Sequence, residues 1–290
     1  MPRILIAGCG YVGAATADLF QAAQWDVEGW THSPESALRL AEKPYPVRAV
    51  DIAERGAVEA SAGAFDAVIH CASSGGGGSE SYRRVYLEGA RSLLAGLQPR
   101  TFIFTSSTSV YAQTSGEWVD EESAAEPSHE TGQILREAEE LVRHSGGLVA
   151  RLAGIYGPGR SALLRKFLAG AARIEAGGDR WLNQVHRDDV AAVLVLLVTR
   201  SNGGELPGPQ IVNVTDDQPI TQRECYEWLA AKLNRPLPAV FAQTGERKRG
   251  ASNKRVSNQK LRALGWEPRF PTFQSGMETS VLPAHPTLGA

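Results

Sequence analysis

Short apolar segments alternate with longer segments of mixed polarity along the first half of the chain. Five apolar segments, most of them rich in β-branched residues, predict strands at 4–7, 47–50, 67–69, 102–104 and 148–152. Helical patterns lie between them at 18–24, 36–42, 83–97 and 135–144. Strands that alternate with helices are typical of βαβ units, whose parallel sheet is covered on both faces. Because βαβ crossovers are right-handed, the pattern predicts an α/β fold with a doubly wound parallel sheet.

The pattern changes after Tyr156-Gly157-Pro158-Gly159. Later segments predict helices at 161–172, 190–198 and 222–233, a strand at 211–214 and a loop at 177–179. We therefore divide the chain into a first domain of residues 1–156 and 184–214 and a smaller second domain of residues 157–183 and 215–282. Residues 283–290 are expected to form a tail.

Composition excludes several classes of protein. The formal charge of −2 over 290 residues gives no general reason to expect nucleic acid or an anionic membrane as a partner. The longest apolar run, 190–198, is half the roughly 18 residues of a candidate membrane helix, so it predicts a buried helix. Three cysteines without a CxxC pair indicate neither a disulfide framework nor a metal site. Since the chain begins directly with a strand pattern, without a secretory signal, we expect a cytoplasmic protein.

A GxGxxG pattern follows the first strand and opens an alanine-rich helix. It reads Gly8-Cys9-Gly10-Tyr11-Val12-Gly13. In this context the first glycine makes the turn, the second lets the backbone approach a pyrophosphate, and the third allows close helix packing. The helix N-terminus favours the phosphates. The pattern predicts an NAD(P) site, and the alternative is a tight turn without a ligand.

The ribose end of this site lacks its usual acid. A carboxylate about 20 residues beyond the loop would bind the adenosine ribose. The segment 25–30 predicts the second strand, and neutral residues follow it: Thr31, His32 and Ser33. Because a carboxylate would repel a 2′-phosphate, their neutrality favours NADP over NAD. Two alternatives are that these residues only cap the next helix, and that Glu28 serves if the strand is shorter.

The segment 102–111, Phe-Ile-Phe-Thr-Ser-Ser-Thr-Ser-Val-Tyr, resembles the strand-and-serine segment of extended short-chain dehydrogenases, the NAD-dependent epimerase/dehydratase family. Other segments agree in order and spacing over residues 3 to 275. These are the glycine loop, Asp51-Ile52, His70-Cys71-Ala72, the stretch from Arg151 to Gly159, the stretch from His186 to Val190, and Leu264-Gly265-Trp266.

The resemblance implies a Rossmann domain, here the first domain, and a smaller substrate domain. In relatives the substrate is often a nucleotide sugar bound in the cleft between the two, and homodimers form through helices that flank the sheet. The resemblance places Asp51 and Ile52 at the adenine, and Cys71, Ala72 and Ser73 along the ribose side. It places Ser107 on the catalytic serine, whose hydroxyl polarises the substrate oxygen; the alternative is a strand-end serine that bonds to local backbone.

The family's acid/base pair, Tyr-x-x-x-Lys on a helix, is missing. Thr131 occupies the tyrosine position and Leu135 the lysine position. A threonine hydroxyl does not ionise near neutral pH, and leucine supplies no charge. Arg136 lies one residue from the lysine position, about 100° around the helix, and is a doubtful replacement. The remaining ionisable candidates, each with a structural alternative, are Tyr111, His129, Glu130, Tyr156 and His186.

Two further segments are open to more than one interpretation. Seven cations lie within residues 247–262: Arg247, Lys248, Arg249, Lys254, Arg255, Lys260 and Arg262. They form either a solvated face or a site that captures an anionic group of a small-molecule substrate; RNA binding is disfavoured because no aromatic residues are interleaved. The glycine run at 75–78 follows the fourth strand, and we expect it to order when the cofactor binds.

These observations favour an NAD(P)-dependent oxidoreductase of the epimerase type, acting on a nucleotide-sugar-like or other hydroxylated substrate without the usual Tyr-x-x-x-Lys pair. The alternative is a non-catalytic NAD(P)-binding sensor or regulatory protein. A purely structural protein is disfavoured, because glycines this costly in backbone entropy are hard to explain without a ligand.

Overall fold

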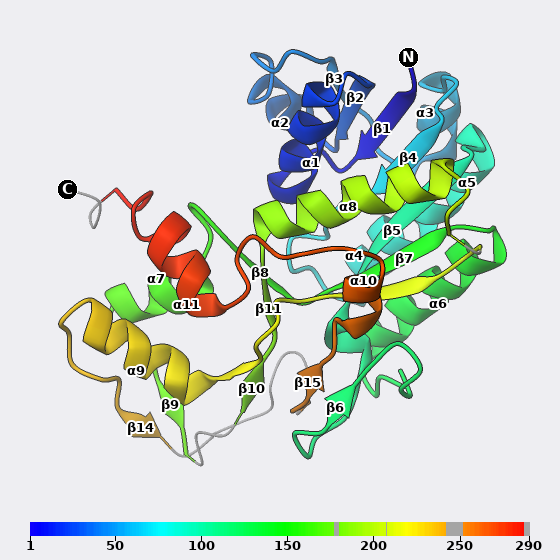
Figure 1. The fold of residues 1–290 in the computed structure, drawn as a ribbon. Helices are drawn as coiled ribbons and strands as arrows, with labels where there is room; N and C mark the ends of the chain where they lie inside the picture. Colours follow the sequence, from blue (N-terminus) through cyan, green and yellow to red (C-terminus); the bar gives the residue numbers. More distant parts are fainter. Residues whose placement is uncertain (177–179, 207, 242–251, 287–290) are drawn as a thin grey trace. The chain divides into compact units, whose positions relative to one another are not determined.

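The computed structural model describes residues 1–176, 180–206, 208–241 and 252–286 (Figure 1). It contains two compact units. The first unit comprises residues 1–110, 127–151 and 190–212, and the second comprises residues 111–126, 152–189 and 213–290. Parts of the basic segment (Arg247, Lys248 and Arg249), the predicted loop at 177–179 and the end of the tail lie outside the described residues.

A seven-stranded sheet is the centre of the first unit. Its order is β12-β7-β5-β4-β1-β2-β3, and the pairs from β3 to β5 are parallel. The strands are β1 (Arg3–Ala7), β2 (Asp26–Thr31), β3 (Val47–Ala49), β4 (Ala67–His70), β5 (Thr101–Ser107), β7 (Leu148–Leu152) and β12 (Ile211–Val214). The predicted doubly wound α/β fold is confirmed. The strand order reverses beside β1, which is where such sheets bind ligands.

Helices flank this sheet (Figure 1). They are α1 (Tyr11–Ala22), α2 (Pro34–Leu38), α3 (Arg55–Ala60), α4 (Ser79–Tyr82), α5 (Gly89–Leu97), α6 (Glu130–His144) and α8 (Arg187–Asn202), with a 3₁₀ turn η2 (Thr108–Val110) after β5. A π-helical segment η1 (Arg83–Glu88) joins α4 to α5, so the helix predicted at 83–97 begins four residues earlier. The predicted helix at 36–42 is shorter, because its second half forms turns.

The second unit is built from four two-stranded pairs. They are β6 (Trp118–Val119) with β15 (Arg255–Val256), β8 (Gly154–Tyr156) with β11 (Gln184–His186), β9 (Ile174–Glu175) with β14 (Val240–Phe241), and β10 (Trp181–Leu182) with β13 (Ile220–Thr221). Its helical segments are α7 (Ala162–Leu168), α9 (Gln222–Lys232), α10 (Gln259–Ala263), α11 (Phe273–Gly276) and η3 (Met277–Val281). Aromatic and aliphatic side chains of α7, α9, α11 and η3 form its core.

Residues 111–126 belong to the second unit, whereas the sequence-based division placed them in the first domain. The reason is the parallel pairing of β6 with β15, which joins residues more than 130 positions apart. The functional roles assigned to the two domains stay predictions.

The apolar run at 190–198 lies within α8, and Val190, Val193, Leu194 and Leu197 are buried as predicted. Across the described ranges, no helix is long and apolar enough to cross a membrane. Nor do three or more His, Cys, Asp or Glu side chains gather there in a way that could hold a metal ion.

Candidate functional site

The glycine loop between β1 and α1 has the geometry that the pattern predicts. Gly8 has φ +100°, and a Cβ there would lie 2.1 Å from the backbone nitrogen of Ala72. A Cβ on Gly13 would lie 2.2 Å from the carbonyl oxygen of Gly8. The loops after β1 and β4 are therefore in direct contact, and the Cys71 N–H donates to the Ala7 carbonyl at 2.8 Å. Neither glycine can be replaced without a shift of backbone.

Gly10 differs from its neighbours, since a Cβ there would meet no atom within 4 Å. It is the N-cap of α1, where no side chain caps the helix and no acidic residue lies in the first turn. Tyr11 and Val12 form that first turn, with Val12 buried. An open approach to an uncapped helix N-terminus fits a pyrophosphate, and the residues present therefore fit a dinucleotide.

The predicted cofactor residues gather at one edge of the sheet. In the parallel ladder Ala7 is opposite Trp30 and His70, so β1, β2 and β4 end side by side. The segments that follow these strands, and β3 beyond them, carry the residues expected at the cofactor: Gly8 to Gly13, Thr31 to Ser33, Asp51 and Ile52, and Cys71 to Ser73.

The Glu28 side chain is buried and hydrogen-bonded within the sheet, so it does not replace the missing ribose acid. It lies three residues before the end of β2 and is 5% exposed. One carboxylate oxygen accepts from the Trp30 indole at 2.7 Å and from Arg48 at 3.2 Å, and the other accepts from Arg3 at 2.9 Å. The strand is thus not short enough for the Glu28 alternative.

The segment after β2 presents neutral donors. The Ser33 hydroxyl caps α2 by accepting from the Ser36 N–H at 3.3 Å. The Thr31 hydroxyl donates to the Ser33 carbonyl at 3.2 Å, and the His32 side chain is 78% exposed. The helix-capping interpretation therefore holds for Ser33, and it is compatible with cofactor binding because His32 remains at the surface.

Asp51 lies at the same edge and is paired with a residue that sequence reasoning missed. Its Oδ2 is 2.5 Å from Arg84 Nη2 and 3.7 Å from His32 Nδ1, while Oδ1 accepts from the Ala53 N–H at 3.0 Å. Arg84 comes from η1 and also contacts Glu54. No local pattern marks Arg84, because the π-helical segment that positions it was predicted as ordinary helix.

The loop after β4 is rich in glycine with left-handed backbone. Gly75 and Gly76 have φ of +67° and +92°, and Ser73 accepts from the Gly75 N–H at 3.4 Å. Gly78 is the N-cap of α4. That this loop becomes ordered when the cofactor binds stays a prediction.

Ser107 is the last residue of β5, the strand next to β4. Its Oγ accepts from the Ser109 N–H at 3.1 Å, which is the local bond of the alternative interpretation. A hydroxyl that accepts from backbone can still donate its own proton, so this contact leaves Ser107 able to polarise a substrate oxygen. The neighbouring Ser106 instead donates to Glu139 at 2.6 Å in the core.

The position of the family lysine lies inside the core. Thr131 is in the first turn of α6, and Leu135, one turn later, is 2% exposed. Arg136 Nη1 lies 2.5 Å from the buried Glu139 carboxylate, and Nη2 lies 3.2 Å from Glu140. Since both of its terminal nitrogens are paired along its own helix, Arg136 does not stand in for the lysine.

Three other candidate acids or bases lie in the second unit and are buried. The Tyr111 hydroxyl donates to Asn213 Oδ1 at 2.9 Å. Tyr156 donates to the Thr272 carbonyl at 3.3 Å, and burial raises the pKa of its phenol. Burial lowers the pKa of His186 to about 4. These contacts account for the three side chains as packing and orienting residues.

His186 illustrates this orienting role. Its Nδ1 accepts from the Asp188 N–H at 3.2 Å, so in the neutral ring Nε2 carries the proton and donates to Ser280 Oγ at 3.0 Å. The other two candidates, His129 and Glu130, are the N-cap and first residue of α6, and Glu130 is exposed.

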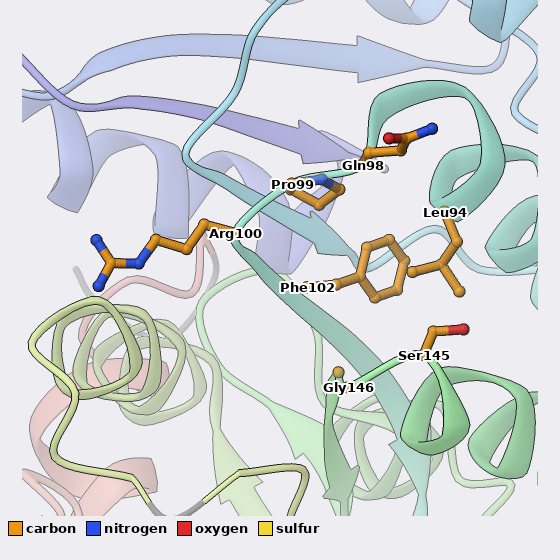
Figure 2. Close-up of a pocket in the computed structure, with 8 residues that line it drawn as sticks. Leu94, Gln98, Pro99, Arg100, Phe102, Ser145 and Gly146 are labelled. Carbon is orange, nitrogen blue, oxygen red and sulfur yellow. The ribbon is translucent and has the colours of Figure 1, made fainter.

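A cavity of about 270 Å³ lies at the opposite edge of the sheet (Figure 2). Leu94, Gln98, Arg100, Phe102 and Ser145 line it, where β5 begins and where α5 and α6 end. Arg100 points away from the apolar pair Leu94 and Phe102 (Figure 2). Because sheets of this type bind ligands beyond the carboxyl ends of their strands, this cavity is not the candidate site.

Comparison with known proteins gives a consistent result. Residues 4–215 match the model of the NAD dependent epimerase/dehydratase family. Protein YeeZ of Escherichia coli K12 is 32% identical over 215 residues, which cover 71% of this chain and 76% of YeeZ.

Solved structures also match over nearly the whole chain. A protein from Methylobacillus flagellatus assigned to the NAD-dependent epimerases/dehydratases has 26% identity and a TM-score of 0.74, with 95% of this chain and 96% of that chain covered. UDP-glucose 4-epimerase from Thermotoga maritima, solved with UDP-glucose, has 16% identity and a TM-score of 0.80, with 96% of both chains covered. Human epimerase family protein SDR39U1, solved with NADPH, has 16% identity and a TM-score of 0.77, with 95% and 98% covered. The last two likenesses show the fold.

Proposed function

Since the chain belongs to the NAD dependent epimerase/dehydratase family, we propose that it is an NAD(P)-dependent oxidoreductase of the epimerase type that acts on a hydroxylated, nucleotide-sugar-like substrate. The observation that carries the proposal is the glycine loop. Gly8 and Gly13 leave no room for a Cβ, whereas the space beside Gly10 is open at an uncapped helix N-terminus. A turn that binds no ligand would need the close packing at Gly8 and Gly13, but it would not need the open space beside Gly10.

The proposed cofactor is NADP. Glu28 is held by two arginines and an indole inside the sheet, so it is not available to a ribose hydroxyl. The segment after β2 offers the exposed His32 and the neutral Ser33, while Arg84, which is paired with both Asp51 and Glu54, adds no net positive charge there. Neutral residues directly after β2 suit a 2′-phosphate better than a carboxylate at the same place would.

In this proposal the chain's own residues bind the cofactor, position the substrate and donate a hydrogen bond to the reacting oxygen. Bound nicotinamide would supply hydride exchange at a carbon that bears a hydroxyl or carbonyl group. Ser107 donates a hydrogen bond to the reacting oxygen, and its retained bond from Ser109 fixes the hydroxyl. With Thr131 and Leu135 at the family's tyrosine and lysine positions, the chain places no ionisable side chain there, so the proton would leave to water.

The first test is cofactor binding to matched glycine variants. Gly10→Ala adds a methyl group where no protein atom is within 4 Å, so the fold is expected to persist while backbone approach to the pyrophosphate is blocked. Gly56→Ala in α3 is the control, because a Cβ there also meets nothing within 4 Å. Calorimetry with NADPH and NADH should show binding by wild type and Gly56→Ala and at least about tenfold weaker binding by Gly10→Ala. Absence of binding by wild type at millimolar cofactor rejects the proposal.

A second candidate function is a non-catalytic NAD(P)-dependent sensor. The observation that favours it is the burial of Leu135, which puts an apolar side chain where the family places its lysine. The two functions differ in whether bound NADPH is consumed when nucleotide sugars and small carbonyl compounds are added. An enzyme loses NADPH fluorescence with at least one of them, and Ser107→Ala should abolish this loss while cofactor affinity stays nearly unchanged. Homodimerisation and a cytoplasmic location belong to the same proposal, and sedimentation analysis tests the first.

A further inference from the structure

The π-helical segment η1 packs against the corner where the resemblance places the adenine. His70, fully buried at the end of β4, donates from Nε2 to the Val85 carbonyl of η1 at 3.1 Å. A Cβ on Gly89, which directly follows η1, would lie 2.9 Å from Ile52 Cδ1 and 3.3 Å from His70 Nε2. The loop after β3, the end of β4 and η1 are therefore in contact, and the backbone of η1 is held in place there.

Arg84 extends from this segment to two carboxylates. Its Nη2 lies 2.5 Å from Asp51 Oδ2, and its Nη1 lies 3.0 Å from Glu54 Oε1. A guanidinium is a rigid planar group, so contacts at both terminal nitrogens fix its orientation. The Arg84 side chain is still 49% exposed, and part of it stays accessible to a ligand.

Asp51 is the residue that the resemblance places at the adenine, and both of its oxygens already have partners. Oδ2 faces Arg84, and His32 Nδ1 lies 3.7 Å from the same oxygen. Oδ1 accepts from the Ala53 N–H at 3.0 Å. The amino group of an adenine is a neutral donor, so it would compete for Asp51 with a guanidinium. Charge-assisted bonds are the stronger ones, and Arg84 therefore has the advantage.

We propose that Arg84 recognises the adenine in place of Asp51: its guanidinium stacks on the base, and Asp51 and Glu54 orient that guanidinium. Arginine planes stack on nucleobases, and stacking is tolerant of the base because every base has a π-face. The inference rests on the proposed function, since it takes the adenosine of NAD(P) to bind beside Asp51 and Ile52. It assigns recognition to the face of the purine and not to its amino group.

The neighbouring Arg83 provides a matched control. It belongs to the same segment, its side chain is also 49% exposed, and its Nη1 lies 3.2 Å from Glu137 of α6. Arg83 thus pairs with α6, whereas Arg84 pairs with the loop after β3. Because an exposed ion pair contributes little to stability, Arg83→Met should leave both the fold and the adenosine corner unchanged.

The test compares the binding of 5′-AMP and of purine riboside 5′-monophosphate, which carries hydrogen in place of the amino group. The phosphate is the same in both, so their affinity ratio reports on the amino group alone. Calorimetry should show that wild type binds both nucleotides within about threefold of each other. Arg84→Met should weaken both about fivefold or more. It should also create a preference for AMP above about threefold, because Asp51 is then free to accept from the amino group.

Arg84→Lys keeps a positive charge beside Asp51 but has no planar face, so it should lose affinity for both nucleotides while their ratio stays near that of wild type. Arg83→Met should match wild type with both. A merely structural role of Arg84 would not change the ratio.

Three results would overturn the inference. They are a preference of wild type for AMP above about threefold, Arg84→Met with an unchanged affinity or an unchanged ratio, and wild type that binds neither nucleotide. NADPH binding by wild type tests the proposed function separately: if NADPH binds and Arg84→Met behaves as wild type, the proposed function stands and the role of Arg84 is rejected.

Discussion

Replacement of Lys254 by methionine should stabilise the protein, by an amount that depends on pH. Methionine is unbranched and of similar length, so it can fill the space of the lysine stem without its charge. Lys254 directly precedes β15 and is 6% exposed. Its burial, and next the charge of Arg180, lower its pKa to about 8, against 10.5 for an ordinary lysine. Below pH 8 the charged form is present in both states, and its burial disfavours the folded one. Lys254→Met removes this penalty.

The size of the effect follows from the two pKa values. One pKa unit corresponds to about 1.4 kcal/mol, so a difference of two to three units lowers the free energy of unfolding by about 3 kcal/mol at pH 7. Between pH 8 and 10.5 the unfolded chain binds more protons than the folded one, so stability rises with pH. The penalty should fall to about 2 kcal/mol at pH 9 and nearly vanish at pH 11.

Urea unfolding followed by circular dichroism measures this difference at pH 7 and pH 9. Lys166→Met is the matched control, because this lysine is exposed in the same unit and its substitution should be neutral at both values. The gain from Lys254→Met should shrink by about 1 kcal/mol between the two pH values. A gain that is the same at pH 7 and pH 9, or a loss of stability at both, would refute the reasoning that a buried charge is present.

Three other substitutions test separate parts of the structure. Ser33→Asp keeps the N-cap of α2, because aspartate caps as well as serine. The new carboxylate should repel the 2′-phosphate, so that NADPH binding weakens about tenfold or more and NADH binding stays unchanged. Equal weakening of both would contradict the proposal that the cofactor is NADP. Arg151→Met removes the 2.7 Å and 3.0 Å bonds to the buried Glu139 carboxylate and should lower the free energy of unfolding by about 3–5 kcal/mol, whereas the exposed Arg143→Met should not. Asp216→Asn should stabilise the protein at pH 7 but not near pH 4, since burial holds the pKa of this carboxyl well above its usual range and the protonated form favours the fold only at low pH; thermal melts at both values check this, and an equal gain at both would contradict it.

The sequence predicts the first unit well because its signals are local. The strands at 4–7, 67–69 and 148–152 are found within one residue of their predicted ends, and the turn at Gly8 is the one the pattern requires. Buried parallel strands are continuous apolar runs, and a strand-glycine-helix corner has a fixed residue order. Such features need no knowledge of the rest of the chain.

The second unit was harder to predict for the opposite reason. The pairing of β6 with β15 joins two-residue strands that have no periodic pattern of their own. Lys254 and Arg255 look alike in the sequence, as members of a basic run, yet Lys254 is only 6% exposed and Arg255 is flanked by two indoles. The surroundings of the two side chains depend on Asn183 and Trp181, which lie about 70 residues earlier. No local sequence rule could therefore predict that the two residues differ.

The catalytic candidates match the family pattern at some positions and depart from it at others. The resemblance places Ser107 and the glycine loop where relatives have them, and the geometry of both is compatible with the roles that we propose. At Leu135 the same resemblance meets a side chain that packs in the core, so a lysine could not be restored there without burying its charge. If the glycine loop binds the cofactor and Ser107 polarises the substrate oxygen, as we propose, a chain with an apolar group at the lysine position can still exchange hydride, provided that the substrate's proton leaves without an activated tyrosine. Reactions in which the substrate proton is already acidic, or in which water accepts it, meet that condition, and they are the reactions to test first.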